Sequence, residues 1–243
     1  GATTNSIEMV EIATLGNSID FGDPAFAGGY GAAFGTFALQ NVTTSNYNTA
    51  VGKNTASNIT TGHSNCAFGW ATMGTSTTCT NNAAFGFQAL YWNTTGSGNV
   101  AIGNQALVAN TTGGNNVGIG NAALDAVTTG GSNTVVGSST GGSITTGSNN
   151  VGMGQSALGS LTTSSNMVAI GAYALENAVT NDTCTAVGSY ALQNTTANSN
   201  TSVGGWSLQN CSTGHSNTAV GRNALNGLTS GHSNIGIGHY AGD

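Results

Sequence analysis

Eight carboxylates are the side chains of this 243-residue chain best suited to acid–base chemistry. Two of them about 5–10 Å apart around a sugar would suit glycoside cleavage. They are Glu8, Glu11, Asp20, Asp23, Asp125, Glu176, Asp182 and Asp243. Nothing in the sequence brings two of them together, and nothing marks a Ser–His–Asp arrangement. We therefore predict that the protein is not an enzyme, and we predict no catalytic residue and no cofactor.

Three histidines recur in Gly-His-Ser-Asn segments: His63, His215 and His232. His215 and His232 lie one period of the chain apart, and stacking at strand spacing would bring them to about 5 Å. A ladder of metal ligands is one interpretation, and a polar corner residue in water is the favoured one. We predict no metal site.

Cysteine offers redox and metal chemistry, but its spacing here favours neither. The four cysteines are Cys66, Cys79, Cys184 and Cys211. They occupy four different positions of the repeat described below, so stacking does not align them for disulfides. No C-x-x-C zinc spacing occurs. We expect small buried or free thiols.

Aromatic side chains are better candidates for recognition. Six lie one or two residues after a recurring glycine, where other repeats carry Lys, Asn, Gln or Arg, so we expect them to face outward. They are Trp70, Phe87, Tyr173, Tyr190, Trp206 and Tyr240. Exposed aromatic rings suit sugar stacking or contact with a partner protein. Packing between subunits is the favoured use, and ligand contact is the alternative.

These residues are set on a repeat that fills most of the chain. A glycine marks each repeat, and the markers are evenly spaced except that the step from Gly188 to Gly204 is shorter by one residue. The markers are Gly35, Gly52, Gly69, Gly86, Gly103, Gly120, Gly137, Gly154, Gly171, Gly188, Gly204, Gly221 and Gly238. A fixed period of about 17 residues is typical of a solenoid.

The columns of the repeat predict how each coil is built. The residue before the marker is apolar, and a mostly leucine column follows four residues after it. We expect these two columns to form a thin core. The residue two before the marker is small in every coil except that of Val135, which lets backbone layers approach. Asparagine dominates four before the marker and suits a hydrogen-bonded ladder. In the Thr-Thr-Gly corner we expect the glycine to supply positive φ.

The fold class follows from this pattern. Segments rich in Thr, Asn, Gly, Val and Ser, and too short for helix hairpins, favour strands. We predict an all-β protein, a parallel β-solenoid (β-roll or β-helix) of about 13 coils over residues 31–243. At about 4.8 Å a coil it would be a rod of about 60 Å. Residues 1–30 lack the repeat and form a separate cap or inter-subunit connector.

Composition excludes several classes of partner. Only 4% of residues are charged, two of them Lys or Arg, and the formal net charge is −6. A nucleic-acid binder needs clustered basic residues to displace counterions, and so does a protein attracted to an anionic membrane surface. No apolar run is long enough to cross a membrane. We therefore expect no nucleic acid and no membrane insertion.

The repeats resemble those of a known family. Units such as Asn99-Val-Ala-Ile-Gly-Asn-Gln-Ala-Leu107 and Asn217-Thr-Ala-Val-Gly-Arg-Asn-Ala-Leu225 resemble the repeats of phage and phage-like tail-fibre proteins. They are also similar to the shorter head repeats of trimeric autotransporter adhesins. The resemblance covers residues 31–243. It implies a parallel β-roll, often in homotrimers, used as a stalk or adhesive fibre, at the virion surface or outside the cell.

The segment before the repeats, residues 1–30, bears on assembly. Residues 5–23 resemble a segment of marine phage structural proteins. Apolar side chains alternate there at Ile7, Met9, Val10, Ile12, Ile19 and Phe21. This segment would cap its own rod or complete the open end of the next subunit. Two assemblies stay open, a side-by-side homotrimer and a head-to-tail filament.

The sequence thus predicts a structural fibre module, a rigid spacer in a virion tail fibre or surface appendage that adheres to a host surface. Its mechanism is mechanical, because repeated coils give stiffness and outer columns present polar and aromatic side chains. The first alternative is a subunit of an extracellular filament that polymerises head to tail. The second is a glycan-binding solenoid, with a cell-surface glycan or host receptor as its partner.

Overall fold

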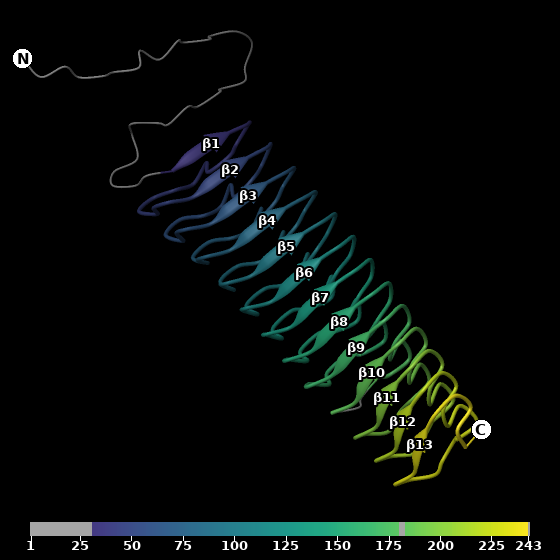
Figure 1. Ribbon diagram of the computed structural model, residues 1–243. Helices are drawn as coiled ribbons and strands as arrows, with labels where there is room; N and C mark the ends of the chain where they lie inside the picture. Colours follow the sequence, from purple (N-terminus) through teal and green to yellow (C-terminus); the bar gives the residue numbers. More distant parts are fainter. Residues whose placement is uncertain (1–30, 180–182, 243) are drawn as a thin grey trace, which may run out of the picture.

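The structure is a computed structural model that describes residues 31–179 and 183–242. Thirteen three-residue strands form one parallel sheet in chain order, and the described residues contain no helix (Figure 1). The strands are β1 (Ala32–Phe34), β2 (Thr49–Val51), β3 (Cys66–Phe68), β4 (Ala83–Phe85), β5 (Val100–Ile102), β6 (Val117–Ile119), β7 (Thr134–Val136), β8 (Val151–Met153), β9 (Val168–Ile170), β10 (Thr185–Val187), β11 (Thr201–Val203), β12 (Thr218–Val220) and β13 (Ile235–Ile237).

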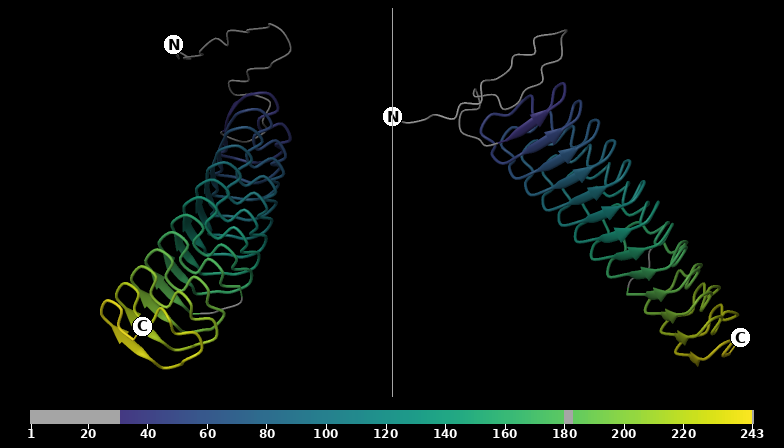
Figure 2. Two further views of the ribbon diagram at one scale, coloured as in Figure 1. Left: turned by 90° about the vertical axis from the view of Figure 1, so that its right-hand side faces the viewer. Right: turned by 45° about the horizontal axis from the view of Figure 1, so that its top comes forward.

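Each coil contributes one strand, so the repeat of the sequence becomes the register of the sheet. Ala33 pairs with Ala50, one full repeat along the chain. Ala186 pairs with Ser202 across the repeat that is shorter by one residue. The predicted parallel β-solenoid is therefore confirmed, and the short repeat is absorbed without loss of strand pairing. The coils stack into a rod with β1 near one end and β13 near the other (Figure 2).

The core differs from the predicted one. In a three-residue strand the middle side chain points opposite to its two neighbours. The middle residues, such as Ala50, Ala84 and Ala101, are buried, so the first and third residues face outward. The apolar column before the marker glycine is this third position, and its side chains lie outside the core: Phe34 is 45% exposed and Ile102 40%. Our prediction that this column lines the core was wrong.

The observed core combines the alanine column with three others. The predicted leucine column is buried, as at Leu90, Leu107 and Leu124, and the residue before it is buried too, as at Ala89. A further column, seven residues after the marker, was not predicted. It is apolar in most coils and polar in four: Val42, Ile59, Ser76, Asn93, Asn110, Val127, Ile144, Leu161, Ala178, Thr195, Cys211 and Leu228.

Opposite the sheet, left-handed residues hold neighbouring coils together. In one coil Gln105 and Leu107 have φ of 54° and 53°. The N–H of Gln105 donates to Phe87 O in the preceding coil at 2.8 Å, and that of Leu107 donates to Ala123 O in the following coil at 2.9 Å. Left-handed geometry costs about 1–2 kcal/mol for each residue with a Cβ. These hydrogen bonds to both neighbours offset that cost.

Glycine serves two purposes, and one differs from the prediction. The marker Gly120 has a φ of +140°, and a Cβ there would lie 2.2 Å from Gly137 O. The corner glycines Gly96 and Gly113, by contrast, lie outside the left-handed region, so the predicted positive φ is wrong. They are small because coils touch there: a Cβ on Gly113 would lie 2.3 Å from Gly130 O.

The predicted asparagine ladder is present and buried. The backbone N–H of Asn65 donates to Asn48 Oδ1 at 3.0 Å, and its side-chain amide donates to the same oxygen at 3.0 Å. The amide also donates to Cys79 O at 2.9 Å, which ties the ladder to the corner. The pattern is interrupted at Met167, whose Sδ accepts the N–H of Cys184 at 3.4 Å.

Candidate functional surfaces

Aromatic rings form ladders along the rod. Tyr173 stacks on Tyr190 with ring centroids 5.0 Å apart, and Tyr190 stacks on Trp206 at 5.8 Å. The guanidinium of Arg222 lies over the next face of Trp206, 5.1 Å from the ring centroid. Each of these rings therefore covers a face of its neighbour. This geometry stabilises the stacking of coils and leaves mainly ring edges to the solvent.

A second ladder lies nearer the N-terminal end of the rod. Trp70 and Phe87 stack at 5.0 Å and are both exposed. Near the other end, the exposed Tyr240 lies 4.3 Å from His239, centroid to centroid. The six aromatic residues singled out in the sequence thus lie at the surface or half-buried. Sugar stacking needs a free ring face, so the stacked ladders favour it less than isolated rings would.

The close approach predicted for His215 and His232 is confirmed. The rings of His215 and His232 are stacked with centroids 5.1 Å apart, and both are exposed. His215 Nδ1 lies 3.3 Å from Ser216 Oγ, and His63 makes the same contact with Ser64 at 3.4 Å. The Ser–His contact is therefore a property of the repeated corner. In the described part of the chain, no three His, Cys, Asp or Glu residues come together to hold a metal ion.

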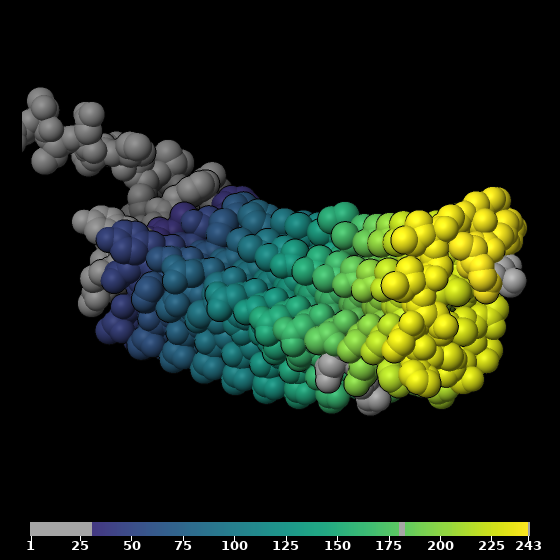
Figure 3. Space-filling view, turned by 60° about the horizontal axis from the view of Figure 1, so that its bottom comes forward, coloured from purple at the N-terminus to yellow at the C-terminus, as the bar shows by residue number. Residues whose placement is uncertain are grey.

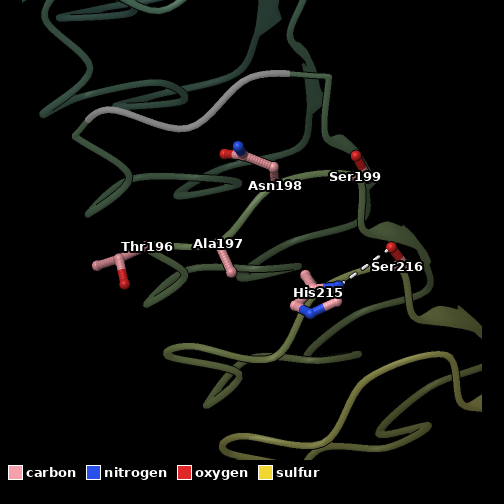
Figure 4. Close-up of a pocket in the computed structure, with 6 residues that line it drawn as sticks. All are labelled: Thr196, Ala197, Asn198, Ser199, His215 and Ser216. Atoms are coloured by element: carbon pink, nitrogen blue, oxygen red, sulfur yellow. Dashed lines mark hydrogen bonds between the residues drawn. The ribbon is translucent and has the colours of Figure 1, made fainter.

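The shortened coil between β10 and β11 carries a shallow depression of about 380 Å³ (Figure 4). It is lined by Thr196, Ala197, Asn198, Ser199, His215 and Ser216. The shortened corner accounts for it, because Thr196-Ala197 replaces the usual Thr-Thr-Gly. One ring nitrogen, hydroxyls and an amide can hydrogen-bond a polar ligand, but no carboxylate lies among the lining residues. Of the usual acid–base side chains the lining holds only a histidine, with no carboxylate beside it to orient the ring.

Two of the eight carboxylates lie among the described residues. Asp125 and Glu176 occupy the same repeat position three coils apart, which places them about 14 Å from one another. That distance exceeds the span of a glycosidase pair, about 5–9.5 Å. Glu176 Oε2 accepts a hydrogen bond from Gln193 Nε2 at 2.7 Å. Burial raises the pKa of Asp125, against hydrogen bonds from its own N–H and that of Ala126.

All four cysteines lie among the described residues as thiols outside any disulfide, as predicted. Cys79, Cys184 and Cys211 are buried, whereas Cys66 is half-buried on the outer face of β3. Burial raises the pKa of Cys66, Cys79 and Cys211. A raised pKa lowers the thiolate fraction, so these side chains are poor nucleophiles at neutral pH.

The N-terminal assembly residues cannot be placed in the fold. Ile7, Met9, Val10, Ile12, Ile19 and Phe21 lie outside the described residues. Their predicted role as a cap or connector stays a prediction.

The largest candidate surface was missed in the sequence. We call it the sheet face: the first and third residues of strands β1 to β13, which point away from the core. Its third-position column is Phe34, Val51, Phe68, Phe85, Ile102, Ile119, Val136, Met153, Ile170, Val187, Val203, Val220 and Ile237. The clue was the middle residue of each strand, which is Ala, Gly or Ser in every strand except β7. In a three-residue strand the middle side chain points opposite to its two neighbours, so either the middle residue or the outer two must face the core.

Comparisons with protein-family models, with curated proteins and with solved structures found no match. In the part of the chain that the structure describes, no helix is long and apolar enough to span a bilayer. The case for a function therefore depends on the rod and its surfaces.

Proposed function

We propose that the protein is a structural fibre module, a rigid spacer in a virion tail fibre or surface appendage. The observation that carries this proposal is the unbroken order of β1 to β13 in one sheet, with each strand paired to its sequence neighbours. Neighbouring coils are joined by strand pairing, by the backbone hydrogen bonds of the left-handed residues opposite the sheet, and by ladders of stacked side chains. Bending the rod would break all three together, so stiffness follows from the repeat.

Rod length gives a direct test of the spacer. Deleting residues 86–153 removes four whole repeats and should shorten the rod by about 19 Å, at about 4.8 Å a coil, while the fold persists. Deleting residues 86–94, about half a repeat, is the control and should disrupt the stacking. Small-angle scattering measures both lengths. A full-repeat deletion that collapses the rod would contradict the proposal.

Location and partners complete the proposal. The module acts at the virion surface or outside the cell and associates with further copies of itself, in a homotrimer or head to tail. Immunogold labelling of particles from the producing organism tests the location, and label confined to the cell interior would contradict it. If negative stain shows long uniform threads, the assembly is the head-to-tail filament and not a discrete fibre.

Host contact is the remaining element of the proposal. The exposed Trp70, Phe87 and Tyr240 are the side chains that we assign to it, against a cell-surface glycan or a receptor. A glycan array with the wild type and with Trp70→Ala separates ligand contact from coil stacking. Retained binding in Trp70→Ala would exclude that ladder from recognition.

A further inference from the structure

The third-position column of the sheet face is apolar along the whole rod, whereas the first position carries Thr in five of the thirteen strands. Its third-position side chains remain exposed in the single chain, for example Ile102 at 40%, Met153 at 49% and Ile237 at 71%. None of its side chains is charged, since the described charged residues Lys53, Asp125, Glu176 and Arg222 all lie elsewhere in the repeat. An apolar strip of this kind marks an interaction site.

The strip is large enough for a specific interface. Thirteen strands at about 4.8 Å make it about 60 Å long, and three residues at about 3.3 Å make it about 10 Å wide. Each copy would bury about 600 Å², hence about 1,200 Å² for a pair. That total lies at the lower end of the range for stable protein interfaces, about 1,200–2,000 Å². Figure 3 shows side chains ordered in lengthwise rows on the rod, so a partner with the same period can interlock with them.

Residue sizes across the strip are matched within each strand. In β1, β3 and β4 the third residue is Phe, and the first is Ala, Cys and Ala respectively. Where the first residue is Thr, Val or Ile, the third is Val, Ile or Met. Phe68 and Phe85 stack at 5.0 Å, so over β3 and β4 the large side chains form a ridge beside the small Cys66 and Ala83.

We propose that the sheet face packs against the same face of another copy of this chain, with the rods parallel and in register. This inference rests on the proposed fibre function and deepens it by naming the surface through which copies associate. Rotation about an axis along the rod sets the first residue of each strand against the third residue of the same strand in the partner. Phe85 of one copy then lies over Ala83 of the other, so the largest third-position side chains meet the smallest first-position ones.

The antiparallel arrangement fits less well. It would set β1 against β13 and third residue against third residue, so the Phe ridge would meet the Val and Ile column of β10 to β13. Cys66 and Ala83 would then face Thr201 and Thr185, which are smaller than the Phe side chains that the parallel arrangement supplies. Voids of methyl size or larger are costly in a packed interface. The size matching within each strand has a use only when like strands meet.

Particle mass tests the interface. Wild-type protein at micromolar concentration should give two or three times the 23.9 kDa of one chain in light scattering. Ile102→Glu/Ile170→Glu should give single chains with an unchanged circular dichroism spectrum, because both sites are exposed in the free rod but would bury unpaired carboxylates in the assembly. Thr112→Glu/Thr146→Glu adds the same charge at exposed corners and should keep the wild-type mass.

Disulfide trapping tests the orientation in a Cys66→Ala background. Thr201→Cys/Val203→Cys should form intermolecular disulfides on mild oxidation if the rods are parallel and in register. Val51→Cys/Val220→Cys is the matched control, because those residues meet between chains only if β2 faces β12 in antiparallel rods. Trapping of the control pair alone would overturn the proposed arrangement.

The outcomes separate this inference from the proposed function. A wild-type particle of one chain would overturn the interface, and so would a mass unaffected by the sheet-face carboxylates. Neither result affects the repeat-deletion test, which reads rod length in monomers and assemblies alike. If the deletion variants fail that test while the wild type is still a multimer, the spacer function is contradicted and the interface is not.

Discussion

The side-chain amide of Asn133 and its backbone N–H both donate to the amide oxygen of Asn116, each at 3.0 Å. The oxygen of Asn133 in turn accepts both donors of Asn150. Each asparagine is therefore positioned by the coil before it and positions the coil after it. Because these groups are buried, a slip of one coil against the next would leave several polar groups without partners.

Asn133→Ala should destabilise the rod by about 2–6 kcal/mol. It leaves Gly147 O and the N–H of Asn150 without this partner, and each unpaired buried group costs about 1–3 kcal/mol. Urea unfolding followed by circular dichroism measures the loss. Coils couple only to their neighbours, so the transition should also broaden as the two halves of the rod unfold separately.

The matched control is Asn104→Ala, at an exposed position of the neighbouring coil. It should change stability by less than about 0.5 kcal/mol. If the two variants lose equal stability, the buried ladder of hydrogen bonds does not account for the loss in Asn133→Ala.

The marker glycine has a geometric requirement that Gly205 lacks. Gly120→Ala combines a φ of +140° with a Cβ 2.2 Å from Gly137 O, so adjacent coils must separate. We expect a loss of more than about 3 kcal/mol or no folded protein. A Cβ on Gly205 would meet only Ser189 O at 3.7 Å, so Gly205→Ala should stay within about 1 kcal/mol of wild type. Thermal midpoints compare the two, and similar midpoints would contradict the expected clash.

The sequence predicted the architecture because period and composition are properties of the whole chain. The even spacing of the coils, the asparagine ladder and the stacking of His215 on His232 all follow from placing equal repeats in register. What it could not predict was which side of each coil is inside. Apolar Val and Ile were placed in the core by their hydrophobicity, whereas the pleat of a three-residue strand puts only the middle alanine there.

Backbone conformation was the other failure, and its cause is also physical. Leucine is disfavoured in the left-handed region, so the sequence did not predict that Leu107 and Leu124 have φ of 53° and 52°. The hydrogen bonds between coils decide that geometry against local preference. The sheet face was missed for a related reason, because exposed apolar residues look like core until the strand ends are known.

Tyr190 tests whether the aromatic ladder stabilises the rod. It stacks on both Tyr173 and Trp206, and each aromatic pair contributes about 0.5–1.5 kcal/mol. Tyr190→Ala should therefore lose about 1–3 kcal/mol in chemical unfolding. Tyr190→Phe keeps the ring and the left-handed backbone strain, so it should lose little. If both variants lose the same amount, ring stacking is not what the ladder supplies.

Asp125 should make stability depend on pH in a direction fixed by its environment. Burial raises its pKa in the folded state, so the folded chain binds this proton more tightly than the unfolded chain. Between the ordinary carboxyl pKa, about 3.9, and the raised folded value, the unfolded state has lost the proton that the folded state keeps. Stability therefore falls as pH rises through that window, and the penalty persists at neutral pH.

Asp125→Asn removes the penalty, so the variant should be more stable than wild type at pH 7, by up to about 0.5 kcal/mol for this half-buried position. Below about pH 3.9 both states of the wild type carry the proton, and the advantage of the variant should disappear. Urea midpoints of the two proteins between pH 3 and pH 7 give this difference directly, because the other carboxylates titrate equally in both. A difference that is constant across the range, or largest at low pH, would contradict a charge held in a partly desolvated site.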